Sequence, residues 1–264
     1  MDGDRRLLSY VGRHGAVSIA HVMAATRLGQ SAAYDRVASL VEAGLLERLE
    51  LLRGAPTLIR ATRSGLRCAG LGIAPAVVSP GSVDHWLRSA SVALDLEARH
   101  GSHRVLTARE LIFAERHEGR PIASAKLGEL PNGAPRLHRP DLVVLPPAHP
   151  LVKDAPLHTY GQGTTTLAGA SDAVAGATAR GIAAARTSAG SSGREAEQLP
   201  VVFEVELTPK SPKTLREIVR GWRRASWVEG VRYLCEPGQT RRAVERAVER
   251  LHAGDRIEIE GISR

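Results

Sequence analysis

The amino-acid sequence predicts an α+β protein built from two folded units, and three observations support this prediction. The chain has 264 residues, which is enough for two modest domains. Residues 1–81 carry apolar side chains first at helical spacing and then in two short strand-like stretches. Residues 82–264 alternate between helix-like and strand-like stretches, interrupted at about 146–199 by a segment of different composition. We therefore expect one domain over 1–81 and a second over 82–264.

The composition is typical of an ordinary globular protein with an excess of basic residues. Hydrophobic residues make up 43% and charged residues 24% of the chain, which excludes a disordered composition. The formal net charge of +8 favours a polyanionic partner. The sequence shows neither the apolar core of a signal peptide nor the run of about 18 apolar residues that a membrane span needs. We expect a cytoplasmic protein without membrane association.

Three helical patterns are expected in the first unit. The first ends at Gly15, and Ser18 has the position of the N-cap of the second. Ser31 is expected to cap the third helix, which ends at Gly44 because glycine favours the position after a helix C-terminus. The apolar positions that define the three helices are Leu7, Leu8, Val11, Ile19, Val22, Met23, Tyr34, Val37, Leu40 and Val41.

Two strands are expected after these helices, over residues 45–52 and 57–61, joined by a turn at 53–56. Helix, helix, short turn, helix and hairpin is the element order of a winged helix-turn-helix. In that fold the third helix enters the major groove of DNA with its N-terminal residues foremost. The sequence therefore predicts a DNA-binding domain, and a winged helix that binds other proteins is the alternative.

The expected DNA contacts lie at the start of the third helix, in the hairpin turn and on nearby arginines. Gln30 has a side chain that can read an adenine edge, and Arg36 can bind a guanine or a phosphate. Arg53 lies in the hairpin turn, and other arginines can neutralise phosphates. The residues predicted to bind DNA in this unit are Arg27, Gln30, Ser31, Tyr34, Arg36, Arg53 and Arg60. A partly buried core position is the alternative for Tyr34.

The second unit is expected to form a sheet covered by helices. Helices are predicted over residues 82–100, 212–227 and 239–252. Strands are predicted over residues 104–109, 139–145, 200–207, 231–235 and 255–260. Ser211 and Pro212 have the N-cap and first-turn positions of the middle helix.

The segment at about 146–199 is rich in Ala, Gly, Ser and Thr and carries few large apolar side chains. Such a composition cannot bury enough apolar surface to offset the entropy that is lost on ordering. We therefore predict a flexible insertion, with a weak helix around 170–187.

Two glutamates lie on one face of the strand predicted at 200–207. Because strand side chains alternate, Glu204 and Glu206 share a face and Phe203 lies on the other. Carboxylates on so apolar a strand are costly to bury without partners. Together with an aspartate from a neighbouring strand they would suit Mg²⁺ or Mn²⁺, which prefer oxygen ligands. The alternative is an amphipathic strand whose glutamates face solvent, each paired with an arginine.

Basic residues follow this acidic strand. Lys210 lies just beyond it, and the next helix carries arginines on one broad face. That face is suited to hold a phosphate backbone beside the glutamates. Its members are Arg216, Arg220, Arg223 and Arg224.

Several stretches together resemble the replication-relaxation family, whose members are encoded on plasmids and mobile elements. They are residues 14–48, Leu-Ile-Arg-Ala-Thr at 58–62, His-Arg-Pro-Asp at 138–141 and Phe-Glu-Val-Glu-Leu-Thr-Pro-Lys-Ser at 203–211. The resemblance covers both units but not the insertion. It implies that double-stranded DNA is the partner and that the protein acts in replication or transfer.

The second unit also resembles the PD-(D/E)xK nuclease superfamily, which has a restriction-endonuclease-like core. Asp141, after a proline, matches the first element of the pattern, Glu204 matches the acid of the second, and Glu206 replaces the lysine. The resemblance implies that Asp141 and Glu204 bind Mg²⁺ or Mn²⁺. It also implies that Glu206, or Lys210 as a migrated lysine, positions or deprotonates the attacking water. Glu97 is an additional candidate acid.

Three functions follow as hypotheses. The first is a metal-dependent endonuclease of plasmid or mobile-element replication or transfer, directed to DNA by its winged helix. The second is a non-enzymatic DNA-binding regulator whose nuclease-like domain serves dimerisation or DNA grip, with a homodimer or other replication or transfer proteins as partners. The third is a winged-helix interaction module whose arginines reflect genome composition. No Gly-x-Ser-x-Gly or phosphate-loop motif is present, so serine hydrolysis and ATP use are not expected.

Overall fold

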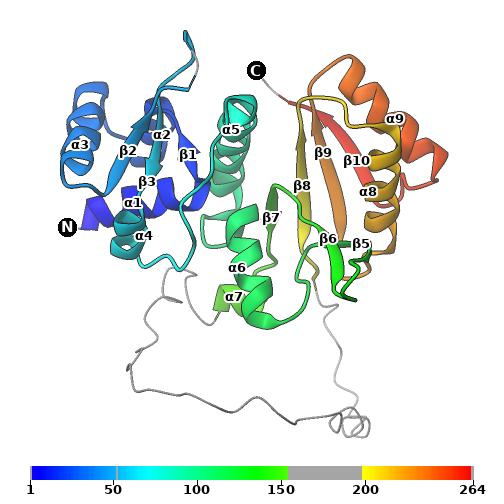
Figure 1. The fold of residues 1–264 in the computed structure, drawn as a ribbon. Helices are drawn as coiled ribbons and strands as arrows, with labels where there is room; N and C mark the ends of the chain where they lie inside the picture. The colour runs from blue at the N-terminus through cyan, green and yellow to red at the C-terminus, as the bar shows by residue number, and fades with distance from the viewer. Residues whose placement is uncertain (1, 52, 154–197, 263–264) are drawn as a thin grey trace, which may run out of the picture.

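The computed structural model describes residues 2–51, 53–153 and 198–262, which form a mixed α+β structure (Figure 1). These residues contain a three-stranded sheet, a five-stranded sheet and a two-stranded hairpin, with helices packed around them. The α+β class predicted from the sequence is therefore confirmed. No helix in the described ranges is long and apolar enough to cross a membrane.

The N-terminal elements are four helices and a small antiparallel sheet with the strand order β1-β3-β2. Their bounds are α1 Asp2–His14, β1 Ala16–Val17, α2 Ile19–Thr26, α3 Gln30–Glu42, β2 Leu46–Leu49, β3 Leu58–Ala61 and α4 Arg63–Ala69. The three predicted helices and the two predicted strands are present. No sequence pattern predicts β1, which has two residues, or α4, which has Gly65 in its interior.

The predicted N-cap of α2 is confirmed, and the predicted N-cap of α3 is wrong. Ser18 is the N-cap of α2 and forms a capping box with His21. The prediction that Ser31 caps α3 is wrong, because the helix begins one residue earlier and Gly29 takes the N-cap position in an extended conformation. The Ser31 hydroxyl instead donates to Asp35 Oδ2, one turn later, at 3.3 Å.

The large sheet has the strand order β10-β9-β8-β7-β4, in which β8, β9 and β10 run parallel and β4, β7 and β8 run antiparallel. Its strands and helices are α5 Val83–His100, β4 Val105–Thr107, α6 Ala108–Glu118, β7 Leu142–Val144, β8 Val201–Glu206, α8 Pro212–Arg224, β9 Gly230–Cys235, α9 Gln239–Arg250 and β10 Ile257–Gly261. One face of this sheet packs against α5, and the opposite face packs against α6, α8 and α9 (Figure 1).

Two parts of this unit differ from the prediction. The strand predicted at 104–109 ends at Thr107, because Thr107 caps α6 and forms a capping box with Glu110. No sequence pattern identified the hairpin of β5 Ala125–Glu129 and β6 Pro135–His138, which lies between α6 and β7.

The described start of the segment predicted as a flexible insertion at 146–199 is helical and packed. Helix α7 Pro150–Lys153 occupies its first residues, and Leu151 is buried in the core of the second unit. Core contacts of this apolar side chain order the start of the segment. Residues 154–197 of the predicted insertion, which include the weak helix at 170–187, lie outside the described residues.

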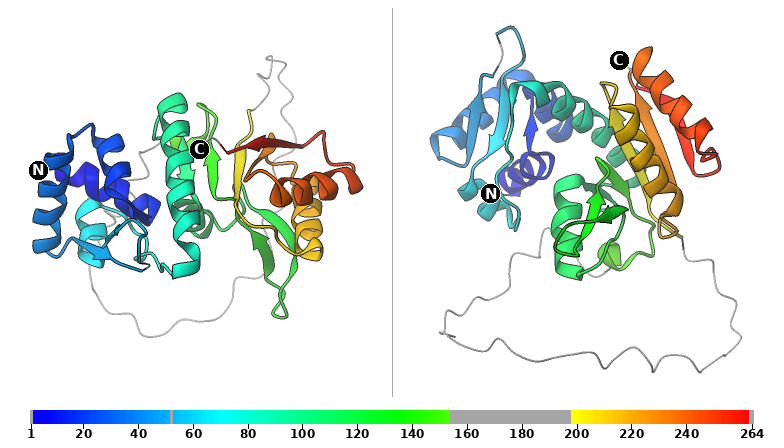
Figure 2. Two further views of the ribbon diagram at one scale, coloured as in Figure 1. Left: turned by 90° about the horizontal axis from the view of Figure 1, so that it is seen from above. Right: turned by 45° about the vertical axis from the view of Figure 1, so that its right-hand side comes forward.

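Helix α5 lies between the N-terminal elements and the large sheet and packs against both (Figure 2). Ala90 is buried in the N-terminal core, whereas Ala93 and Leu96 are buried against the large sheet. At the start of the helix, Trp86 packs so closely on Gly15 that a Cβ there would lie 2.5 Å from the indole ring. Gly15 also has a φ of +81°, so both its backbone and this close approach require glycine.

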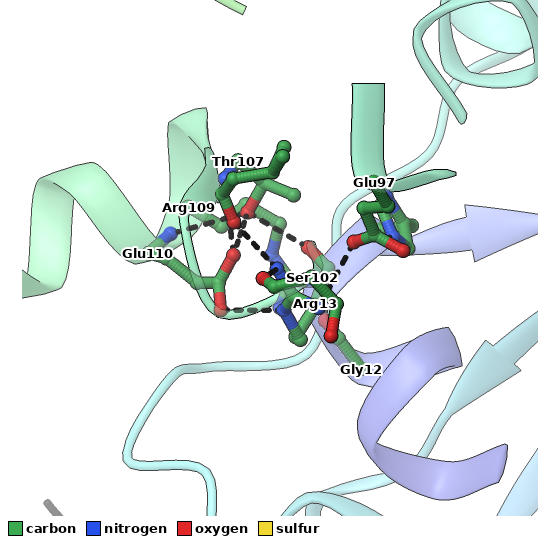
Figure 3. A network of polar contacts seen from close by, with 9 residues as sticks. Gly12, Arg13, Glu97, Ser102, Thr107, Arg109 and Glu110 are labelled. Carbon is green, nitrogen blue, oxygen red and sulfur yellow. Dashed lines mark hydrogen bonds and ion pairs between the residues drawn. The ribbon is translucent and has the colours of Figure 1, made fainter. Parts of the chain in front are cut away.

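A buried ionic network joins the two units (Figure 3). Arg13, at the end of α1, is 4% exposed and donates to Glu110 Oε1 at 2.7 Å. Its guanidinium lies 3.0 Å from Glu97 of α5 and donates to the carbonyl oxygens of Ser102 and Val105. One arginine of the first unit therefore binds two carboxylates of the second. We call Arg13, Glu97 and Glu110 the junction network.

Candidate functional site

The three predicted carboxylates meet at one end of the large sheet. Asp141 immediately precedes β7, and Glu204 and Glu206 lie in the last half of β8. The antiparallel register pairs Leu142 with Phe203, and its continuation by one residue sets Asp141 beside Glu204. Directly opposed residues have Cβ atoms about 5 Å apart. We call Asp141, Glu204 and Glu206 the acid cluster.

The two glutamates of the acid cluster are buried. Glu204 is 4% exposed and Glu206 is 5% exposed, while Phe203 packs with α5 on the opposite face, as the predicted alternation requires. The alternative of a solvent-facing amphipathic strand is wrong, because α8 covers this face and places Trp222 against Glu204. Buried carboxylates need donors, and the structure supplies at least one for each.

Glu204 binds two side chains that no sequence pattern identified. His138 of β6 places Nε2 2.6 Å from Glu204 Oε1, and the Trp222 indole N–H donates to the same oxygen at 3.0 Å. Burial lowers the pKa of His138, but the charge of Glu204 and its hydrogen bond outweigh burial, and the pKa is raised. Glu204 is therefore held in one orientation by two rings, which meet edge to face.

Asp141 is held between a backbone donor and a histidine. The Val205 N–H donates to Asp141 Oδ2 at 2.7 Å, and His85 Nε2 lies 2.9 Å from Asp141 Oδ1. The hydrogen bond to Asp141 raises the pKa of His85 and outweighs the opposite effect of burial. Because Val205 lies between the two glutamates of β8, its N–H ties Asp141 to the acidic strand.

Glu206 is in contact with the predicted lysine. Lys210 Nζ reaches Glu206 Oε2 from the loop that follows β8. Burial raises the pKa of Glu206, Lys210 lowers it, and the negative charges of Glu204 and Asp141 raise it again, so the net pKa is raised. The structure therefore brings all four residues predicted to be catalytic into one region.

Sequence reasoning missed His85, His138 and Trp222. His138 lies three residues before Asp141 in the His-Arg-Pro-Asp stretch, so its position in that motif was an available signal. His85 is 56 residues before Asp141, and Trp222 follows only the apolar pattern of α8. No sequence spacing links these residues, because packing of α5, β6 and α8 around the sheet brings them together.

Glu97, the additional candidate acid, is not part of the acid cluster. It follows His85 by twelve residues on α5, which corresponds to about 18 Å along the helix axis. Its carboxylate lies 3.0 Å from Arg13 and 3.5 Å from His14. Burial acts to raise the pKa of Glu97, but His14 and Arg13 outweigh burial and lower it. Glu97 therefore belongs to the junction between the units.

The arginines of α8 are divided between solvent and internal contacts. Arg216 is half-buried, and Arg220 is exposed. Arg223 and Arg224 donate to backbone carbonyl oxygens of neighbouring elements, at 3.0 and 3.4 Å. We therefore keep Arg216 and Arg220 as the candidates for contact with a phosphate backbone.

The acid cluster fits a magnesium or manganese site with two carboxylate ligands. Mg²⁺ is commonly bound by one or two carboxylates and keeps several waters, and the strand register sets Asp141 and Glu204 side by side. Within the described ranges, no group of three or more His, Cys, Asp or Glu side chains is arranged to hold a metal ion. A cation between Asp141 and Glu204 would take over contacts that His85 and His138 now make.

The predicted DNA-contacting residues of α3 are on the surface. Gln30, Ser31 and Arg36 are exposed, and Tyr34 is 46% exposed, so Tyr34 does not take the alternative core position. Arg36 forms an ion pair with Asp4 of α1 at 3.0 Å. The N-terminal half of α3 therefore presents polar and aromatic side chains to solvent.

The other three predicted arginines differ in their surroundings. Arg27 is exposed between α2 and α3 in a left-handed conformation with a φ of 58°. Arg53 is exposed in the turn between β2 and β3. Arg60 is half-buried and donates to Glu47 and to the carbonyl oxygen of Ala76. Internal partners hold the Arg60 guanidinium, so Arg60 is the weakest of the predicted DNA contacts.

Comparisons with protein-family models, with curated proteins and with solved structures found no match to this chain. The features of the chain that bear on its function are therefore the acid cluster and the exposed surface of the N-terminal elements. Both follow from the geometry of the described residues.

Proposed function

We propose that the chain is a DNA-binding protein of plasmid or mobile-element replication or transfer, with a winged helix-turn-helix followed by a PD-(D/E)xK nuclease-like domain. The order of three helices and the β2–β3 hairpin supports the first domain. Exposed Gln30 and Tyr34 on α3, and exposed Arg53 in the hairpin turn, support contact with double-stranded DNA.

The acid cluster supports phosphodiester hydrolysis as the activity of the second domain. Burial, and then repulsion from Glu204 and Asp141, raises the pKa of Glu206. Apolar residues would form a more stable strand than these charges do. Clustered carboxylates with perturbed pKa values concentrate at catalytic sites. The burial of two glutamates beside an aspartate is the observation that carries this proposal.

The contacts within the acid cluster support a role for each ligand of the proposed metal. Asp141 and Glu204 would hold Mg²⁺ or Mn²⁺, which supplies an activated water and neutralises charge that develops on the phosphate. The Val205 N–H orients Asp141, and the Trp222 indole N–H orients Glu204. These donors limit the carboxylates to one geometry before substrate arrives.

The basic residues beside the cluster complete the proposed site. Lys210, in contact with Glu206, lies where it can hold the attacking water and its proton. Arg216 and Arg220 on α8 are placed to contact the phosphate backbone that leads into the site.

Nicking of supercoiled plasmid tests the proposed activity. We expect nicked and linear DNA with the wild type and Mg²⁺ or Mn²⁺. The isosteric variants Asp141→Asn and Glu204→Gln are expected to lower the rate at least about 100-fold, because a metal ligand contributes several kcal/mol to transition-state stabilisation. Glu258→Gln, which changes an exposed acid on β10, is the matched control and is expected to retain the wild-type rate. Nicking that persists in both cluster variants would assign the activity to another site.

A non-enzymatic regulator is the second candidate, and one observation favours it. His85, His138 and Lys210 already bind the three carboxylates of the acid cluster, so each carboxylate has a protein partner without a metal. The nuclease-like domain would then serve DNA grip, a homodimer, or contact with other replication or transfer proteins. A wild type that shifts DNA in a gel in a salt-sensitive manner, but never nicks it, supports the regulator.

A further inference from the structure

A second candidate site lies in the N-terminal half of the molecule. A cleft of about 840 Å³ is formed by α1, the turn between α2 and α3, and the second half of α5. Its lining residues do not include the acid cluster. This volume falls in the range of about 300–1,000 Å³ that is typical of ligand pockets. The cleft is therefore large enough for a small molecule and is separate from the proposed nuclease site.

The rim of the cleft is basic. Arg5, Arg6 and Arg27 line it and are exposed, and no ion pair among the described residues involves any of the three. Arg36 also lines the cleft, where Asp4 pairs with it. Guanidinium groups bind phosphates with two parallel hydrogen bonds. Three arginines without a carboxylate partner therefore suit a phosphorylated ligand.

The inner wall carries one buried hydroxyl without a hydrogen-bond partner. Tyr10 lines the cleft and is 8% exposed, and its hydroxyl has no hydrogen-bond partner among the described residues. Glu97 also lines the cleft, but its Oε1 is already held by the junction network, 3.0 Å from Arg13 and 3.5 Å from His14. Buried polar groups in folded proteins are nearly always hydrogen-bonded. The Tyr10 hydroxyl therefore points to a ligand that carries a polar group on its inner side.

Apolar side chains, among them Leu28 and Leu94, form the rest of the wall. We propose that the cleft binds a free nucleoside phosphate. Its phosphates bind Arg5, Arg6 and Arg27, and its base packs against Leu28 and Leu94. Inorganic phosphate would leave the apolar wall uncovered, and an alkyl chain would leave the Tyr10 hydroxyl unsatisfied.

Isothermal titration calorimetry of the full chain with ATP and with GTP tests this proposal. EDTA is included so that a metal bound by the acid cluster cannot contribute. We expect one site per chain for at least one of the two nucleotides, with a Kd below about 1 mM. Inorganic triphosphate carries the charge without the base and is expected to bind at least about tenfold more weakly, because it leaves the apolar wall in water.

Two variants and a matched control locate the binding. The double variant Arg5→Ala/Arg6→Ala removes two rim charges, and Ala98→Phe fills the cleft from an exposed lining position without a change of charge. Both are expected to raise the nucleotide Kd at least about tenfold. Arg242→Ala/Arg246→Ala removes the same charge from the exposed face of α9 and is expected to change the Kd by less than about twofold.

Several results would overturn the proposal. They are the absence of binding by the wild type below about 1 mM, an unchanged Kd in Ala98→Phe, and an equal loss in the α9 control. Arg27 and Arg36 line the cleft and are also predicted DNA contacts. Arg5 and Arg6 are not, so a gel shift separates the two sites: Arg5→Ala/Arg6→Ala is expected to shift DNA almost as the wild type does. Loss of DNA binding as large as the loss of nucleotide binding would make the cleft part of the DNA interface. Arg5→Gln alone replaces the double variant if circular dichroism shows that the latter is unfolded.

Discussion

The junction network and the acid cluster are both built from buried acids, but their charges are arranged in opposite ways. In the junction network Arg13 lies between two glutamates, so the charges alternate in sign. In the acid cluster three carboxylates are neighbours, and the basic partners His85, His138 and Lys210 stand around them. Buried charges that alternate in sign stabilise the fold. Neighbouring charges of the same sign destabilise it, and they are typical of catalytic or binding sites.

Exposure to solvent separates the two clusters further. The Arg13 and Glu110 side chains are each 5% exposed, so water does not screen their pairing. The His85 and Lys210 side chains are 43% and 35% exposed, so solvent and a substrate can reach the basic partners of the acid cluster. The comparison predicts that changes in the junction network mainly affect folding, and that changes in the acid cluster mainly affect activity.

The largest expected effect is on the junction network. Arg13→Met leaves Glu97 and Glu110 buried without their cation, and we expect the free energy of unfolding to fall by about 3–5 kcal/mol. Urea denaturation of the full chain measures this loss. Arg6→Met, on the exposed face of the same helix, is the control and is expected to cost less than about 0.5 kcal/mol. A loss below about 1 kcal/mol for Arg13→Met would show that the network does not hold the units together.

A smaller effect on stability is expected in the acid cluster. Glu206→Gln removes a charge that burial and neighbouring acids disfavour, and its partner Lys210 is partly screened by solvent. We expect the free energy of unfolding to change by less than about 1 kcal/mol in the same urea experiment. A loss as large as that of Arg13→Met would make the acid cluster a structural element and would remove the distinction between the two.

The pH dependence of stability sharpens the comparison. Because the pKa of Glu97 is lowered in the folded protein, its contribution is present above the unfolded pKa of about 4.3 and is lost as the pH falls through the lowered value. We expect wild-type stability to fall more steeply between about pH 5 and pH 3 than that of Glu97→Gln, as followed by chemical denaturation. Asp95→Asn, an exposed neighbour on α5, is expected to keep the wild-type slope.

The smallest effect concerns the surface of the first unit, away from both buried clusters. Arg53→Ala is expected to lower the slope of log Kobs against log salt concentration for DNA binding by about 1, because one phosphate contact is lost. Gel shifts at several salt concentrations measure this slope. Arg67→Ala, on the exposed face of α4, serves as the control. An unchanged slope in Arg53→Ala would exclude the hairpin turn from the DNA surface.

Much of the fold could be predicted because the signals are local. Ser211 and Pro212 mark the start of α8, and the structure confirms this start with the Ser211 hydroxyl accepting from Thr214. The β5–β6 hairpin could not be predicted from apolar periodicity. Gly221 of α8 packs against Ala125 and Leu127 of β5, so the contacts that position this hairpin come from a helix far along the chain.

The sequence by itself determined that Glu204 and Glu206 share one strand face, because side-chain alternation is a property of the extended backbone. Only the tertiary structure decided that this face is buried, that His138 binds Glu204 and that His85 binds the adjacent Asp141. These partners lie 56 and 66 residues before the carboxylates that they contact. Contacts at such separations depend on how all helices pack on the sheet, and no local spacing encodes that packing. For the same reason only the structure assigned Glu97 to the junction between the units.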